Sequence, residues 1–199
     1  MFSGEEKAWE TISNLDPSDV CKRANVLYDR DTASYLLKSF GFDFSITPLK
    51  REIKNLSEKG EFFTKKLAYF FRPSVISYLA NAKEIPLSER LKKPENTRGG
   101  EFFFQGSHML PLNMVAEKYG SNREGFLEKG KELSGKILDF EDVSFELLPL
   151  PRIPVTLILW LSDEEFPART DIFFDSTCDI HVPLDIIWSI AMISILVVL

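Results

Sequence analysis

Residues 155–161, with the sequence VTLILWL, restrict the fold more than any other part of the chain. Thr156 is the only polar residue in this run. Its length suits a strand rather than a helix, and a strand that is apolar on both sides must be covered on both faces of its sheet. The run therefore predicts a central strand with other elements packed on either side of the sheet.

Further strands are predicted beside this run and near the N-terminus. Residues 145–148 precede the run, and residues 170–174 follow it after a turn rich in carboxylates, which indicates a C-terminal hairpin. Residues 26–28 and 34–40 flank a turn-like segment, and an alternating stretch follows them. Its period of two places four apolar side chains on one face, namely Phe40, Phe42, Phe44 and Ile46. We expect an N-terminal β-meander.

Several helices are predicted to pack against these strands. The helix at residues 17–24 has the best start signal, because Asp16 can cap it and Pro17 suits its first position. Pro73 is expected to kink or split a helix at residues 64–83. Further helices are predicted at residues 5–13 and 112–119, and from a capping box at Ser121 to about Gly135. The chain therefore predicts an α+β fold with an antiparallel or mixed sheet, and its 199 residues fit a single domain, 1–199.

The C-terminal segment at residues 186–199, IIWSIAMISILVVL, contains no charged residue. A helix that crosses a bilayer needs about 20 apolar residues, and basic residues usually flank it. The segment is shorter than that and has no such flank. We therefore expect it to be buried in the domain or covered by a partner; a membrane tail and a truncated chain end are the alternatives.

Composition argues against several classes of function. A net charge of −6 disfavours nucleic acid as a partner, because binding to phosphates requires basic surface. The two cysteines, Cys21 and Cys178, are too few for a disulfide framework or for a site with four thiolate ligands. The first nine residues lack the basic and apolar regions of a secretory signal. We expect an acidic cytoplasmic protein with reduced thiols.

Carboxylates form the strongest polar cluster in the sequence. Asp163, Glu164 and Glu165 lie in the turn between the two C-terminal strands, and Asp175 follows the second strand. Together with His108 they are the candidates for acid–base catalysis, and hard cations also bind carboxylate oxygens. If the two strands pair, however, the turn and Asp175 lie at opposite ends of the hairpin. Whether these groups converge stays open, and a structural role is the alternative for each.

Other residues are candidates for binding a cofactor or a metal ion. The cofactor candidates are Gly99, Gly100, His108 and Trp160, although the glycine pair lacks the further residues of a phosphate-binding loop. The metal candidates are Asp175, Cys178 and His181, since the Cys-x-x-His spacing can supply two ligands. The alternative is a buried thiol next to a surface imidazole. The chain contains no G-x-S-x-G, H-E-x-x-H or dinucleotide-binding motif, so neither a cofactor nor an enzymatic reaction is specified.

Several segments resemble a prokaryotic family known as domain of unknown function 3786. The most specific are Pro151-Arg152-Ile153-Pro154, Leu157-Ile158-Leu159-Trp160, Asp163-Glu164-Glu165-Phe166-Pro167 and Phe173-Phe174-Asp175. Upstream, Gly99-Gly100, Gly106-Ser107-His108 and Leu110-Pro111-Leu112 also fit the pattern of that family. The resemblance covers most of the chain.

The resemblance implies a context rather than a reaction. The family occurs in anaerobic bacteria and archaea, and some relatives carry a cysteine-rich iron–sulfur module of the kind seen in corrinoid proteins; this chain lacks that module. Members usually end in an amphipathic helix, from which residues 186–199 depart. We therefore expect a binding or accessory domain for a small cofactor or a redox partner in anaerobic corrinoid or one-carbon metabolism. The alternatives are a carboxylate-based or metal-dependent enzyme, and a structural protein that binds a partner through its apolar C-terminus.

Overall fold

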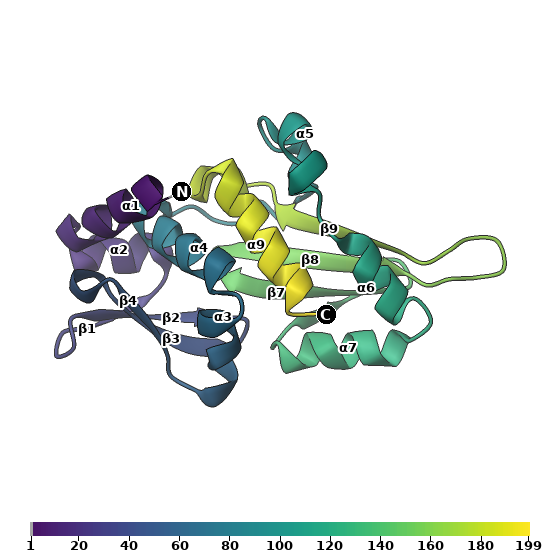
Figure 1. Ribbon diagram of the computed structural model, residues 1–199, viewed down its shortest axis with the longest axis horizontal. Coiled ribbons are helices and arrows are strands. Elements are labelled where there is room, and N and C mark those ends of the chain that lie inside the picture. The colour runs from purple at the N-terminus through teal and green to yellow at the C-terminus, as the bar shows by residue number, and fades with distance from the viewer. Residues whose placement is uncertain (1) are drawn as a thin grey trace.

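An antiparallel sheet forms the first layer of the structure, a computed structural model that describes residues 2–199 (Figure 1). Its strands follow chain order: β1 (Leu27–Asp29), β2 (Ser34–Ser39), β3 (Phe42–Thr47) and β4 (Glu52–Asn55). In the register of the central pair, Leu37 lies opposite Phe44 and Tyr35 lies opposite Ile46. This sheet confirms the predicted N-terminal meander.

The turn between β2 and β3 differs from the predicted alternation. Phe40 and Gly41 have φ angles of 50° and 82°, so they form the turn instead of belonging to a strand. A two-residue hairpin turn with positive φ at both positions matches the twist of the strands that it joins. The Phe40 ring is nevertheless only 1% exposed and stacks on Phe63 at 5.1 Å between centroids, because the turn points into the core.

A second antiparallel sheet is built mainly from the C-terminal half. Its order is β5 (Leu91–Lys92), β9 (Arg169–Asp175), β8 (Ile153–Trp160), β7 (Val143–Leu150) and β6 (Lys136–Leu138). All of β8 except Trp160 is buried, and the strand lies between β7 and β9. The central strand and the C-terminal hairpin that the sequence predicts are therefore confirmed, and both sheets are antiparallel.

The two sheets meet where β2 ends. The backbone N–H of Phe40 donates to the carbonyl of Leu148 at 2.9 Å, and the Ser39 hydroxyl donates to the carbonyl of Pro149 at 2.6 Å. Apolar side chains from both sheets belong to one buried cluster. The α+β architecture thus contains two sheets joined through one core.

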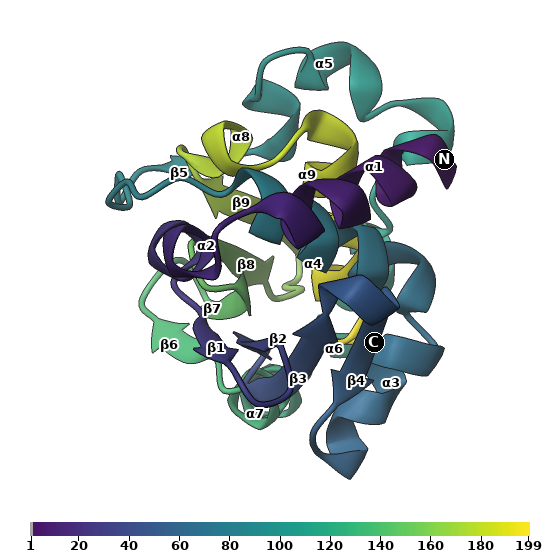
Figure 2. The same ribbon diagram turned by 90° about the vertical axis from the view of Figure 1, so that its left-hand side faces the viewer.

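The helices surround these sheets, as Figures 1 and 2 show. They are α1 (Phe2–Asn14), α2 (Pro17–Ala24), α3 (Glu61–Lys65), α4 (Ala68–Asn81), α5 (Gly100–Phe103), α6 (Leu112–Tyr119), α7 (Arg123–Glu132), α8 (Cys178–His181) and α9 (Leu184–Leu196). Short 3₁₀ turns are η1 (Pro48–Lys50), η2 (Glu58–Gly60), η3 (Pro94–Asn96) and η4 (Gly106–His108).

Two helix predictions need correction. The predicted helix at residues 64–83 is interrupted before Ala68, not at Pro73, which lies inside α4. The N-cap of α7 is Asn122, not Ser121. The Asn122 side chain accepts from the backbone N–H of Gly125 at 3.0 Å. By contrast, α2 has the predicted bounds and Asp16 caps it through the N–H of Ser18.

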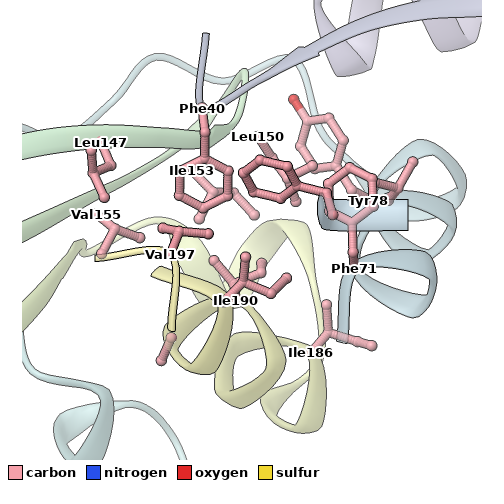
Figure 3. Close-up of a cluster of buried hydrophobic side chains, with 14 of the residues drawn as sticks. Phe40, Phe71, Tyr78, Leu147, Leu150, Ile153, Val155, Ile186, Ile190 and Val197 are labelled. Carbon is pink, nitrogen blue, oxygen red and sulfur yellow. The ribbon is translucent and has the colours of Figure 1, made fainter. Parts of the chain in front are cut away.

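The apolar C-terminal segment forms α9 and is packed inside the domain. Figure 3 shows Ile186, Ile190 and Val197 facing side chains of α4, β7 and β8, including Phe71, Leu147 and Val155. All six of these side chains are buried. Within residues 2–199, no helix is both long enough and apolar enough to cross a membrane.

Candidate functional site

Asp163, Glu164 and Glu165 lie in the exposed loop that connects β8 to β9. Asp163 is engaged within this loop, because its Oδ1 accepts from the backbone N–H groups of Phe166 at 2.7 Å and Glu165 at 2.8 Å. These two hydrogen bonds lower the pKa of Asp163 from its ordinary value. The carboxylate thus orders the turn, which is the structural alternative for this residue.

Asp175 lies at the other end of β9. Trp160 pairs with Arg169 beside the acidic loop, whereas Asp175 ends the strand six residues later. At about 3.4 Å per residue, roughly 20 Å of strand separates the two positions. The acidic loop and Asp175 are therefore not brought together.

Asp175 holds the segment that enters β5. Its carboxylate, 5% exposed, accepts from the backbone N–H groups of Ser88, Glu89 and Thr177 at 2.8–3.1 Å and from the hydroxyls of Ser88 and Thr177. Burial raises the pKa of Asp175, but the hydrogen bonds from Thr177 and Ser88 outweigh it, so the pKa lies below the ordinary value. An ionised carboxylate with this many donors is a structural anchor.

His181 and Cys178 lie close to Asp175, on the short helix α8. The His181 side chain is fully buried, and its Nδ1 accepts from the backbone N–H of Lys83 at 3.2 Å. The proton of the neutral ring is therefore on Nε2, which has no hydrogen-bond partner among the described residues. Burial raises the pKa of the Cys178 thiol to about 12, which keeps it protonated.

The arrangement of these three residues does not offer a set of metal ligands. A protonated Nε2 has no lone pair for a metal ion, and a thiol binds metals as the thiolate. Across residues 2–199, no group of three or more His, Cys, Asp or Glu side chains is placed to hold a metal. Instead, Asp175 and His181 both bind the connection between α4 and β5, at Ser88 and Lys83.

His108 lies elsewhere, in an aromatic cluster. Its ring stacks on Phe103 at 4.3 Å and meets Trp188 of α9 edge to face at 5.1 Å. The Trp188 indole N–H is buried without a hydrogen-bond partner in the described part of the chain. None of the hydrogen bonds or ring contacts of residues 2–199 joins His108 to Asp163 or Asp175.

The remaining cofactor candidates have local structural roles. Gly99 adopts a φ of 82° before α5, and a Cβ on Gly100 would lie 2.4 Å from the carbonyl oxygen of Pro94. Trp160 lies at the end of β8 with the guanidinium of Arg169 4.0 Å from its ring centre. The glycine pair begins the short helix α5, which also carries the Phe103 ring that stacks on His108, and no hydrogen bond or ring contact of residues 2–199 joins Trp160 to His108.

The structure contains a groove that the sequence did not reveal. It lies between α1, α4 and the start of α9, has a volume of about 720 Å³ and is lined mainly by apolar surface. Pockets of about 300–1,000 Å³ are typical for small organic ligands. Of the residues that line it, none is a catalytic, cofactor or metal candidate from the sequence.

Two parallel rows of side chains on α4 form the floor of the groove. Residues four apart share a face of a helix, and the lining residues follow this rule in two adjacent rows: Ala68, Arg72, Ile76 and Ala80, then Tyr69, Pro73, Ser77 and Asn81. The α1 wall has the same spacing at Gly4 and Ala8 and at Lys7 and Thr11. Helices α1 and α4 lie side by side (Figure 2), and the small residues in these rows take up little of the room between them.

One ion pair joins two walls of the groove. Arg72 on α4 donates to the carboxylate of Glu5 on α1 at 3.3 Å, and the same carboxylate oxygen accepts from the indole of Trp9. Pro73 has no N–H, so the carbonyl of Tyr69 lacks its helical donor. Near the end of α4, the Asn81 amide donates to the carbonyl of Ser77 at 2.8 Å.

A family model supports the resemblance that the sequence motifs indicate. The model described as Domain of unknown function (DUF3786) matches residues 16–196, and the chain therefore belongs to this family. Helix α1 precedes the matched region. No curated protein and no solved structure is significantly similar to the chain.

Proposed function

We propose that this member of the DUF3786 family is a binding domain, and that a small organic molecule occupies the groove between α1, α4 and α9. The observation that carries the proposal is the groove itself: its volume of about 720 Å³ and its mainly apolar lining suit a ligand of small-molecule size. Three helices supply its walls, so the site is built from regular elements rather than from a single loop.

The surroundings of the other candidate residues also favour binding over catalysis. Asp175 and the Nδ1 atom of His181 accept hydrogen bonds from the backbone between α4 and β5. Acid–base catalysis requires groups that converge on one substrate, whereas the acidic loop is roughly 20 Å of strand away from Asp175. The burial of α9 likewise argues against an interface made by the apolar C-terminus.

The family context extends the proposal to a metabolic setting. We take the ligand to be a small cofactor or metabolite of anaerobic one-carbon or corrinoid metabolism, bound in the cytoplasm. A complete corrinoid is much larger than the ligands for which a groove of this size is typical. The proposal therefore favours a smaller compound from such metabolism.

The test is to identify the occupant and to show where it binds. The full chain is purified without oxygen, and bound compounds are extracted and identified by mass spectrometry. Two variants fill the groove from opposite walls, Ala8→Trp and Ala80→Trp, and Glu128→Trp on the exposed face of α7 is the matched control. Circular dichroism establishes that all variants are folded.

The proposal expects a bound compound in the wild type and in Glu128→Trp, and its loss from both groove variants. A compound retained in Ala8→Trp and Ala80→Trp would assign binding to another surface and overturn the proposal. If no compound co-purifies, a thermal-shift screen of metabolites replaces extraction; no stabilisation of the wild type by any of them would also overturn it.

A further inference from the structure

Charges in the groove balance. Its lining contains two acidic residues, Glu5 and Asp185, and two basic residues, Lys7 and Arg72. Glu5 and Arg72 neutralise each other through their ion pair. Lys7 and Asp185 are exposed at the rim, where water and salt weaken their attraction for a ligand. A charged ligand would lose hydration in the apolar part of the groove without a compensating net charge, which favours an uncharged ligand.

The length of the groove indicates an elongated apolar body. The lining rows of α4 extend from Ala68 to Asn81, which corresponds to about 20 Å along the helix axis. The Tyr69 ring is 57% exposed at one end of these rows, and Phe70 holds it edge to face at 5.0 Å. The small side chains of Ala68 and Ala80 leave room along the floor for an alkyl chain or a slender ring system.

The other end of the rows offers hydrogen bonds. Asn81 uses its amide N–H on Ser77, but in the described residues its Oδ1 accepts no hydrogen bond. Ser77 is only 8% exposed. Its hydroxyl oxygen accepts from the Asn81 amide, but its hydroxyl proton is donated to no acceptor within residues 2–199. One acceptor and one donor are thus available on the last turn of α4, which matches a neutral head group such as a primary amide or a hydroxyl.

We infer that the groove binds an uncharged amphipathic molecule, whose apolar body lies along α4 and whose neutral hydrogen-bonding head meets Ser77 and Asn81. This inference rests on the proposed function and adds the chemical class of the ligand. It separates three kinds of ligand that an apolar groove alone does not distinguish: neutral, anionic and cationic amphiphiles.

Three probes that share an alkyl chain of the same length but differ in the charge of the head group test the inference: decanamide, decanoate and decylammonium. Isothermal titration calorimetry at pH 7, below the aggregation concentration of each probe, measures their affinities for the full chain. Decanamide is expected to bind about tenfold more tightly than either ion. Asn81→Leu should lower the affinity for decanamide about threefold to tenfold. Asn113→Leu, at an exposed position of α6, should leave this affinity unchanged.

Asn81→Asp adds a negative charge at the proposed head position and supplies a second readout. It should raise the affinity for decylammonium and lower that for decanoate. Equal or tighter binding of an ion than of decanamide to the wild type would overturn the neutral-ligand inference and leave the proposed function standing. If none of the probes binds, but a natural compound is lost from Ala80→Trp, this inference fails alone. If neither probes nor natural compounds bind, both proposals fail.

Discussion

The Nδ1 atom of His181 accepts a hydrogen bond from the backbone N–H of Lys83, which links α8 to the end of α4 across 98 residues of chain. Burial lowers the pKa of His181, the positive charges of Arg152 and Lys83 lower it further, and the negative charge of Asp175 opposes them. Protonation of Nδ1 would also break the bond to Lys83. The native fold therefore contains a neutral imidazole.

This arrangement predicts that the protein loses stability as the pH falls below about 6.5, the ordinary pKa of histidine. There the unfolded chain binds a proton that native His181 does not bind, so the free energy of unfolding decreases by up to about 1.4 kcal/mol per pH unit. Urea unfolding at pH 7, 6 and 5 measures the slope. His181→Asn should flatten this slope, and an unchanged slope in His181→Asn would refute the assignment.

Replacement of Asp175 should destabilise the fold without affecting the groove. Asp175→Asn removes the charge and half of the acceptor capacity from a carboxylate that binds Ser88, Glu89 and Thr177. The expected loss is about 2–3 kcal/mol in the free energy of unfolding, measured with urea at pH 7. Glu164→Gln, in the exposed loop, is the matched control and should change it by about 0.5 kcal/mol or less. Similar losses in both variants would mean that Asp175 is not an anchor.

Phe40 should contribute far more to stability than an exposed phenylalanine. Its ring is 1% exposed at the junction of the two sheets, whereas Phe102 is 81% exposed on α5. Phe40→Ala should lower the free energy of unfolding by about 3–5 kcal/mol because it leaves a cavity in the core. Phe102→Ala should cost about 0.5 kcal/mol or less. Chemical denaturation of both variants measures the difference, and comparable values would show that the turn does not pack as described.

The two cysteines should react at different rates in the native protein. Cys178 is 1% exposed and burial raises its pKa to about 12, while Cys21 is half-buried. Iodoacetamide at pH 8 should modify Cys21 at least about tenfold faster, because alkylation requires an accessible thiolate. Mass spectrometry of timed samples measures the rates, and labelling in urea should make them equal. Equal rates without denaturant would contradict the buried position of Cys178.

The sequence predicted those parts of the fold in which a local pattern is sufficient. The apolar run at residues 155–161 identified the central strand β8, and Asp16 with Pro17 identified the start of α2. Phe40 was placed in a strand because alternation continues through it, although a positive φ at Phe40 and Gly41 makes them the turn. An alternation of apolar and polar residues does not reveal such a turn when the turn itself contains an apolar residue that continues the pattern.

The candidate site was beyond the reach of the same reasoning. Asp175 is conspicuous as a carboxylate, but its partners Ser88 and Glu89 are 87 and 86 residues away in the chain. The groove depends on how α1, α4 and α9 cross, which no single segment encodes. The spacing of Ala68 and Ala80 on α4 was a usable signal, since small residues on one helical face indicate close approach or open space, but it does not say which.

Helix α1 supplies one wall of the groove, yet the family match begins at Asp16, after α1 has ended. The α1 wall of the groove therefore lies outside the matched region, whereas the walls formed by α4 and the start of α9 lie inside it. A substitution at Gly4 or Ala8 reshapes the groove while leaving the matched region of the domain unaltered. On the proposed function, α1 is thus the one wall of the groove that can change without any change in the matched region.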